Sequence, residues 1–507
     1  MKADDTPNTQ RDEQTPYSAW LNAGHVCQQV GNPHLAVDAF QKAIDCEPDR
    51  YEAHLAMAGV LQLLHQGPLA ENAFAEALRC VSRPTPGSAG NPTQQAVRTA
   101  QVAQRMGRFS LDSDHTPAAI RALHIGLQAL SGTEPAINDL RAELQIDLAE
   151  ALWQQGRHDK AMWQLKSAAA GTREATLTRL AALHFRLNHW REALAVSRSN
   201  AERHPQSTAA RWSLAHMLAE CWQLDEAERA LQQAEAMGPA DGALQLRATL
   251  ACRRGDADAA LRIYRTLASQ PDAAPSHAAQ AAWASLHSSQ LSGQEMADLH
   301  CELFAPLGQD ARPADSFKRP PLAGRRLKLG IVSADFRRHH PVNVFMQPVL
   351  RELDRSRIEV FLYFTGAVHD DATRLAEQRV EHWLDVGPLN NAQLAQRIDK
   401  DGVDLLLDLA GHTEPQRMAL FGKRAAPVQA TYLGYPGSTG VPNMDWIIAD
   451  NVVAPPGSDA LFSEKVMRLP ATLVCFAPEA HYSSPGRSRY AASVAGDGRS
   501  PKRIWRR

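Results

Sequence analysis

No two cysteines in the chain stand at CxxC spacing, although seven are spread over its 507 residues. Thiols that lie far apart are typical of a reducing compartment, and they argue against both a disulfide framework and a zinc site. No apolar run approaches the roughly 20 residues that a membrane-spanning helix needs. The start of the sequence, MKADDTPNTQRDEQTP, has no apolar segment of the kind that marks a signal peptide. These absences predict a cytoplasmic protein with no membrane partner.

The sequence also lacks an excess of one charge, because its formal net charge is −2. A dominant nucleic-acid surface is therefore not expected. The dinucleotide motif GxGxxG does not follow the first expected strand, and the chain contains no P-loop. The histidines of the first half show no metal-ligand spacing: His25, His34, His54, His65, His158 and His184. We expect neither a metal ion nor another cofactor.

What the sequence does contain is a repeat. Small and aromatic residues recur at an offset of 34 positions, so that Ala36, Phe40 and Ala43 correspond to Ala70, Phe74 and Ala77. This period is typical of tetratricopeptide repeats, in which small residues let two helices approach closely. Similar units continue to about residue 270, with a Pro/Gly/Ser-rich break near residues 82–95. The sequence thus predicts an α-solenoid over residues 17–270.

The segments around the repeats lack this pattern. Residues 1–16 are polar, and we expect them to be disordered. Residues 271–326 combine a helical stretch with a linker rich in proline and basic residues, which we interpret as a helical cap followed by a domain boundary. Stacked repeats form a concave groove, and we favour a groove that binds a protein or peptide. A spacer or a homodimerisation arm is the alternative.

From Leu327 onward, apolar runs alternate with helical patterns. The runs read LKLGIVSADF, IEVFLYF, HWLDVG, VDLLLDL, VQATYLGYP and MDWIIAD. Strands that alternate with helices through short loops are typical of a doubly wound parallel sheet with right-handed crossovers. We therefore expect an α/β, Rossmann-like lobe over residues 327–478.

Polar residues and glycines follow three of these strands. In chain order they are Asp335, His339 and His340, then Gly411, His412 and Thr413, and then Gly434, Tyr435, Pro436 and Gly437. The ends of parallel strands lie on one edge of a sheet, so the three loops are expected to converge. Imidazole groups there suit proton transfer or hydrogen bonds to a sugar hydroxyl or phosphate. Alternatively, Asp335 caps a turn or helix, and the last loop is a tight turn whose glycines also permit close approach to a ligand.

Four stretches of the lobe carry a family resemblance: GIVSADFRRHHPV, DLLLDLAGHT, RAAPVQATYLGYPGSTGVPNMDWIIAD and SEKVMRLP. Together with the preceding repeats they resemble the protein O-GlcNAc transferase family and its plant Spindly-type relatives. That family joins tetratricopeptide repeats to a glycosyltransferase of the GT-B fold. The resemblance implies transfer of a sugar, with UDP-GlcNAc as the expected donor, to Ser or Thr hydroxyls of proteins without a metal ion.

The resemblance also implies roles for the loop residues. The family's active-site histidine falls on His339 or His340, because one extra residue in this chain shifts the motif. We favour His340, and the choice stays open. His412 is the other catalytic candidate, within a triplet that is expected to face the sugar or the pyrophosphate. The remaining residues of the three loops are expected to bind the donor.

A GT-B enzyme has two Rossmann-like lobes, and in this family the second carries most of the nucleotide contacts. Residues 479–507 are basic and rich in glycine and serine, without a strand pattern from which that lobe could be built. We expect this tail to be disordered and sugar transfer by the chain to be impaired. The alternative from another class is a tetratricopeptide adaptor protein with a vestigial catalytic lobe.

Overall fold

The computed structural model describes residues 15–83, 91–131, 137–238 and 242–477, and it divides into two compact units, residues 1–243 and 244–507. The disorder expected for residues 1–16 and 479–507 falls outside the described residues, except that Thr15 caps the first helix and Pro16 begins it. Within the described ranges, no helix is both long enough and apolar enough to cross a bilayer.

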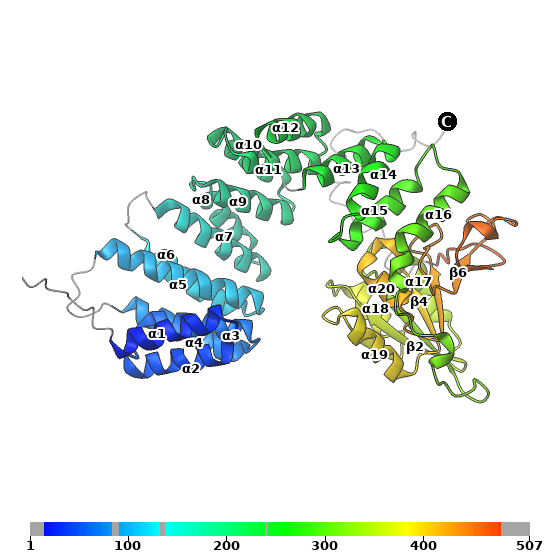
Figure 1. Cartoon of the computed structure of the whole chain (residues 1–507), viewed down its shortest axis with the longest axis horizontal. Helices are drawn as coiled ribbons and strands as arrows, with labels where there is room; N and C mark the ends of the chain where they lie inside the picture. Colours follow the sequence, from blue (N-terminus) through cyan, green and yellow to red (C-terminus); the bar gives the residue numbers. More distant parts are fainter. Residues whose placement is uncertain (1–14, 84–90, 132–136, 239–241, 478–507) are drawn as a thin grey trace, which may run out of the picture. The chain divides into compact units, whose positions relative to one another are not determined.

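The first unit consists of consecutive helix pairs, drawn in blue to green in Figure 1. Its described helices are α1 (Pro16–Gln29), α2 (Pro33–Cys46), α3 (Tyr51–Leu63), α4 (Gly67–Ser82), α5 (Pro92–Asp112), α6 (Thr116–Ala129), α7 (Asn138–Gln154), α8 (His158–Ala168), α9 (Glu174–Arg186), α10 (Trp190–Arg203), α11 (Thr208–Glu220) and α12 (Leu224–Met237). Small residues let the paired helices approach. At Gly24, for example, a Cβ atom would lie only 2.5 Å from Cδ1 of the buried Phe40.

Each helix pair of this unit turns through one residue in the left-handed backbone conformation. These residues are Gly31, His65, Asp114, Gly156, Asn188 and Trp222, with φ between 55° and 77°. They stand shortly after the first helix of each pair, where a left-handed residue ends a helix. Two of the six are glycine, and the others accept a conformation that costs a side chain about 1–2 kcal/mol.

Replacing Gly31 with Ala is expected to destabilise the first unit by about 1 kcal/mol. No atom lies within 4 Å of a Cβ at this position, so the loss comes from the backbone conformation alone. Gly67→Ala is the matched control, because this site is equally open but lies in the first turn of α4 with ordinary φ. Urea unfolding of the two variants checks the prediction, which is contradicted by equal midpoints.

The second unit begins with the helices α13 (Ala243–Arg254), α14 (Ala257–Ala268), α15 (Pro275–Ser285) and α16 (Gly293–Phe304). A seven-stranded sheet follows, made of β1 (Leu327–Ser333), β2 (Ile358–Phe364), β3 (His382–Asp385), β4 (Leu405–Asp408), β5 (Val428–Tyr432), β6 (Trp446–Ala449) and β7 (Lys465–Arg468). The strand order is β3-β2-β1-β4-β5-β6-β7, and all neighbouring strands are parallel. The predicted fold class, an α-solenoid followed by a Rossmann-like lobe of the GT-B type, is confirmed. The strand β7 was not predicted.

Side chains alternate between the two faces of this sheet. Ile331 and Leu407 pack on one face with α17 (Pro341–Glu352) and α18 (Asp371–Glu377). Val332 and Leu406 pack on the other face with α19 (Asn391–Asp401) and α20 (Pro415–Gly422). Ala282 of α15 and Phe304 of α16 belong to that second core. Part of the segment expected as a helical cap, residues 271–326, therefore shares the hydrophobic core of the sheet.

Candidate active site

The sheet reverses its winding direction between β1 and β4. From β1 the chain proceeds to β2 and β3 on one side, and from β4 it proceeds to β5, β6 and β7 on the other. In doubly wound sheets, ligands bind outside the carboxyl ends of the strands at such a switch point. The loops after Ser333 and Asp408, the last residues of β1 and β4, therefore begin where a ligand site is expected.

Asp335 and His340 face each other in the loop after β1. His340 Nε2 lies 3.4 Å from Asp335 Oδ1, and the two side chains are 27% and 13% exposed. Pro341 begins α17 and favours the extended backbone of His340 directly before the helix. Burial lowers the pKa of His340 and raises the pKa of Asp335. At neutral pH the imidazole is therefore uncharged and able to accept a proton.

His339 is placed differently from its neighbour. It has a left-handed backbone, with φ of 65°, and its side chain is exposed. The adjacent Arg338 anchors the loop to α18, since its Nε donates to Asp371 Oδ1 at 2.9 Å and its backbone N–H donates to Asp370 Oδ2 at 2.7 Å. The sequence left open which of the two histidines is the active-site residue. The geometry favours His340, because it faces a carboxyl group.

Two further carboxyl groups lie close to Asp335, and sequence reasoning missed both. Asp408 is buried and accepts hydrogen bonds from the backbone of Ala410 and Gly411 and from the Thr431 hydroxyl. Burial raises its pKa to about 6, and Asp335 adds to the shift. Glu414 accepts a hydrogen bond from Thr365 at the end of β2. Its pKa is raised by burial and further by Asp335 and Asp408.

Both residues had a recognisable position in the sequence. Asp408 is a charged residue within an apolar strand, and Glu414 directly follows the Gly-His-Thr triplet. Within the described ranges, no group of three or more His, Cys, Asp or Glu side chains is arranged to hold a metal. Burial and mutual repulsion make the protonated forms of Asp408 and Glu414 more favourable.

The second and third loops pack directly against each other. A Cβ atom on Gly411, which has φ of 56°, would lie 2.5 Å from Cβ of Tyr435. A Cβ atom on Gly434 would overlap with the carbonyl oxygen of Leu409 and lie 2.7 Å from Cα of Ala410. The glycines expected to permit close approach to a ligand thus permit close approach of protein to protein. Thr413 and Pro436 are the exposed residues of these loops.

The imidazole of His412 is enclosed by protein. Its ring is stacked on Phe304, with centroids 3.8 Å apart, and meets the ring of Tyr435 edge to face at 4.9 Å. Its Nε2 donates to the carbonyl oxygen of Thr439 at 2.7 Å, which fixes a neutral tautomer. Burial lowers the pKa of His412 to about 3. This histidine shares the edge with His340 but is held between the two loops and α16.

The neutral state of His412 predicts a pH dependence of stability. Its folded pKa of about 3 lies below its ordinary value of 6.5, so the stabilisation is complete above pH 6.5 and is lost as the pH falls toward 3. We expect the titration of His412 to lower the free energy of unfolding of the second unit by about 2 kcal/mol between pH 7 and pH 5. Thermal unfolding at both pH values checks this. His412→Phe should flatten the dependence, and the exposed His339→Ala should leave it unchanged.

His300 on α16 is a site residue that sequence reasoning missed. Its Nδ1 donates to the carbonyl oxygen of Met296 at 2.7 Å, and its Nε2 accepts the hydroxyl proton of Tyr435 at 2.7 Å. The backbone of His300 also packs on Gly440, where a Cβ would lie 2.5 Å from its carbonyl oxygen. Helix α16 therefore fixes the third loop, although nothing in its sequence distinguishes this histidine from a packing residue.

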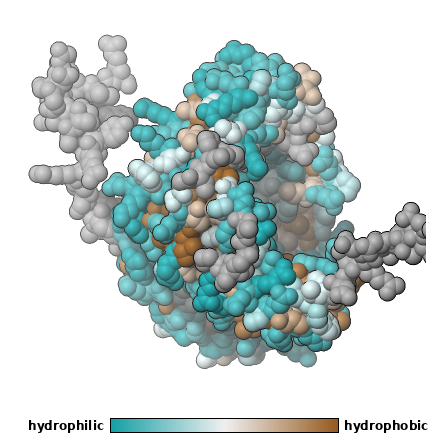
Figure 2. Space-filling view, turned by 90° about the vertical axis from the view of Figure 1, so that its left-hand side faces the viewer, coloured by the Kyte–Doolittle hydropathy of each residue, from teal (hydrophilic) through white to brown (hydrophobic). Residues whose placement is uncertain are grey.

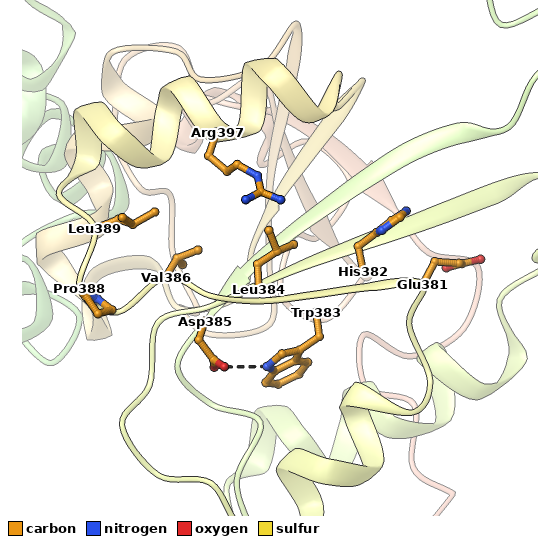
Figure 3. A pocket seen from close by; sticks show the side chains of 9 residues that line it. All are labelled: Glu381, His382, Trp383, Leu384, Asp385, Val386, Pro388, Leu389 and Arg397. Carbon is orange, nitrogen blue, oxygen red and sulfur yellow. Dashed lines mark hydrogen bonds between the residues drawn. The ribbon is translucent and has the colours of Figure 1, made fainter. Parts of the chain in front are cut away.

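A pocket of about 640 Å³ lies elsewhere on the lobe, beside the edge strand β3 (Figure 3). Its lining includes Trp383, which donates from Nε1 to Asp385 at 3.2 Å, and Arg397 of α19. The sheet order places β2 between β3 and β1, and none of the predicted site residues lines the pocket. The pocket is thus separate from the three loops.

The fold and the three loops define a class of domain, a Rossmann-like lobe with polar side chains at the carboxyl ends of its strands. Residues 308–479 match the sequence model of glycosyl transferase family 41, and residues 17–50 match that of a tetratricopeptide repeat. The lobe is similar to the glycosyl transferase family 41 region, and the resemblance to the protein O-GlcNAc transferase family is confirmed.

Individual relatives agree with this assignment. The chain is 33% identical over 168 residues to the probable UDP-N-acetylglucosamine–peptide N-acetylglucosaminyltransferase SPINDLY of Oryza sativa, which covers 32% of the chain and 18% of that protein. It is 37% identical over 153 residues to the UDP-N-acetylglucosamine–peptide N-acetylglucosaminyltransferase of Caenorhabditis elegans, which covers 29% of the chain and 13% of that protein. The matches thus span less than a fifth of these relatives.

Among solved structures, a mutant of the Thermobaculum terrenum O-GlcNAc transferase is 25% identical to the chain. The match has a TM-score of 0.45 and covers 71% of this chain and 59% of the other.

Proposed function

We propose that the lobe forms the acceptor-side half of a sugar-transfer site, in which N-acetylglucosamine passes from UDP-GlcNAc to a Ser or Thr hydroxyl of a protein. The observation that carries this proposal is the Asp335–His340 pair at the switch point between β1 and β4. It lies within the residues that match glycosyl transferase family 41. The relatives' names supply the donor and the acceptor class.

His340 is the group that acts on the acceptor hydroxyl. Because burial keeps its imidazole uncharged, Nε2 can accept the hydroxyl proton while the oxygen attacks the anomeric carbon. Asp335 lies beside Nε2 and stabilises the imidazolium that forms. The attacking oxygen must lie in line with the departing uridine diphosphate, and positioning of this kind supplies a large part of such catalysis.

Two groups in the same loop can stabilise the negative charge of the leaving diphosphate. Helix α17 begins at Pro341, and the side chain of its N-cap residue, His340, makes no capping hydrogen bond, so the positive end of the helix dipole favours an anion there. Arg337 is exposed and close enough to Asp335 and His340 to affect the pKa of both. We assign Arg337 to the diphosphate, together with the exposed Thr413 of the second loop.

His412 holds the wall of the site and does not contact the substrate in this proposal. Its ring and its Nε2 are both occupied by protein, which leaves the exposed Thr413 and Pro436 to face the crevice. Tyr435 is likewise occupied by His300. Gly434 and Gly437 shape the loop around them.

The repeats are assigned to the protein acceptor, which would bind in their groove. All seven cysteines are free thiols, which supports a reducing, cytoplasmic location. Homodimerisation through the repeats is compatible with this assignment, and sedimentation velocity tests it.

The experiment is turnover of UDP-GlcNAc by the purified chain, followed as release of UDP with and without a Ser/Thr-containing protein acceptor. Release that depends on His340 supports the proposal. Neither turnover nor binding of UDP-GlcNAc at millimolar concentration would leave the tetratricopeptide adaptor as the function.

A further inference from the structure

A groove with apolar and basic side chains lies between α4 and α6 of the first unit, and we call it the α4–α6 groove. It has a volume of about 540 Å³. Leu78, Met106 and Ile125 provide its apolar part. Ile125 is 40% exposed, whereas Leu123 on the same helix is fully buried. Leu78 is buried and Met106 is half-buried, so Ile125 presents the exposed apolar surface of the groove. An exposed apolar side chain beside an apolar floor is a surface that a partner can cover.

The charge of the groove has one sign, because its lining includes Arg79, Arg83 and Arg121 but no aspartate or glutamate. Arg79 pairs with Glu76 at 2.7 Å, and Arg83 lies 3.9 Å from Asp49, with all four side chains well exposed. Exposed pairs of this kind are weak and are easily exchanged for a partner's carboxylates. Arg121 is exposed and makes neither an ion pair nor a hydrogen bond with any residue of the described ranges.

Figure 2 shows the side of the chain on which α1–α6 lie. Brown apolar surface appears there beside hydrophilic side chains. The charged side chains that line the α4–α6 groove are arginines, which select for a partner with negative charge.

We propose that the α4–α6 groove binds a short segment of a partner protein in which one bulky apolar side chain is flanked by carboxylates. The apolar side chain covers Met106 and Ile125, and the carboxylates pair with Arg83 and Arg121. A nucleic acid fits this surface less well, because the basic groups surround a small apolar area and do not form an extended basic face. The proposal does not rest on sugar transfer.

The test uses the full chain and a fluorescein-labelled peptide, Gly-Asp-Glu-Phe-Asp-Glu-Gly, with binding followed by fluorescence anisotropy. We expect saturable binding that weakens at least about tenfold when lysine replaces the acidic residues or alanine replaces phenylalanine. Arg121→Glu and Ile125→Asp should each weaken binding to the same degree. Both side chains are exposed, so the variants should fold, and circular dichroism confirms this. Arg229→Glu on α12, an equally exposed position outside the groove, is the control.

Charge reversal provides the sharpest outcome, because the Arg121→Glu variant should gain affinity for the lysine peptide. The proposal is overturned by an absence of saturable binding, or by binding that the groove variants do not change. It is also overturned if a second copy of the chain covers the groove. Sedimentation velocity would then show a dimer that Arg121→Glu dissociates.

Discussion

Replacing His340 with Ala is expected to lower the turnover of UDP-GlcNAc by about 100- to 10,000-fold, the range that a general base contributes. The reason is local, because His340 Nε2 lies 3.4 Å from Asp335 Oδ1 at the end of β1 and burial keeps the ring uncharged. Asp335→Asn should cause a smaller loss, since it removes the charge that stabilises the imidazolium but leaves the ring in place. Initial rates of UDP release measure both effects.

His339→Ala is the matched control, because it removes an imidazole one residue away that is exposed and does not face Asp335. Its turnover should stay within about threefold of the parent chain, a difference below 1 kcal/mol in transition-state free energy. If His339→Ala abolishes turnover while His340→Ala does not, the register of the histidine motif assigned here is wrong. A pH–rate profile separates chemistry from folding, because the lower limb should follow the ionisation of His340.

Replacing Gly434 with Ala is expected to destabilise the second unit by about 3 kcal/mol, the upper range for overpacking in a tight interior. The added Cβ would overlap with the carbonyl oxygen of Leu409 and lie 2.7 Å from Cα of Ala410. These are backbone atoms, so no side-chain rotation can relieve the clash. Because the two loops form one wall, turnover should fall together with stability.

Gly387→Ala provides the control for this change. Gly387 lies in the same unit, has ordinary φ and is exposed, and its nearest neighbour would be 3.5 Å from an added Cβ. Its substitution should shift the free energy of unfolding by less than about 0.5 kcal/mol. Thermal unfolding of the second unit compares the two variants. Equal stability of both would show that the loops do not pack as described.

The sequence predicted that the three loops share one edge of the sheet, because that prediction needs only strand order along the chain. Alternation of strands and helices implies parallel strands, and parallel strands place their ends together. It could not choose between His339 and His340, because the choice depends on a left-handed backbone at one and an extended backbone at the other. Both positions are histidine, so residue type cannot separate them.

Long-range packing explains the other differences. His300 meets Tyr435 from 135 residues away, and a single histidine in an amphipathic helix gives no local indication of such a partner. The glycines at 411 and 434 were interpreted as ligand contacts, because the sequence does not show which atoms lie beside a missing Cβ. The strand β7 is only four residues long, too short for a distinctive pattern.

The proposed function depends on which edge of the lobe receives the donor sugar nucleotide. Hydrogen–deuterium exchange of the chain with and without UDP-GlcNAc tests this most directly. We predict that bound donor slows exchange in residues 334–343 and 410–414, the loops after β1 and β4 and the first turn of α17. Slower exchange confined to residues 381–397, which line the pocket beside β3, would contradict the assignment of the site.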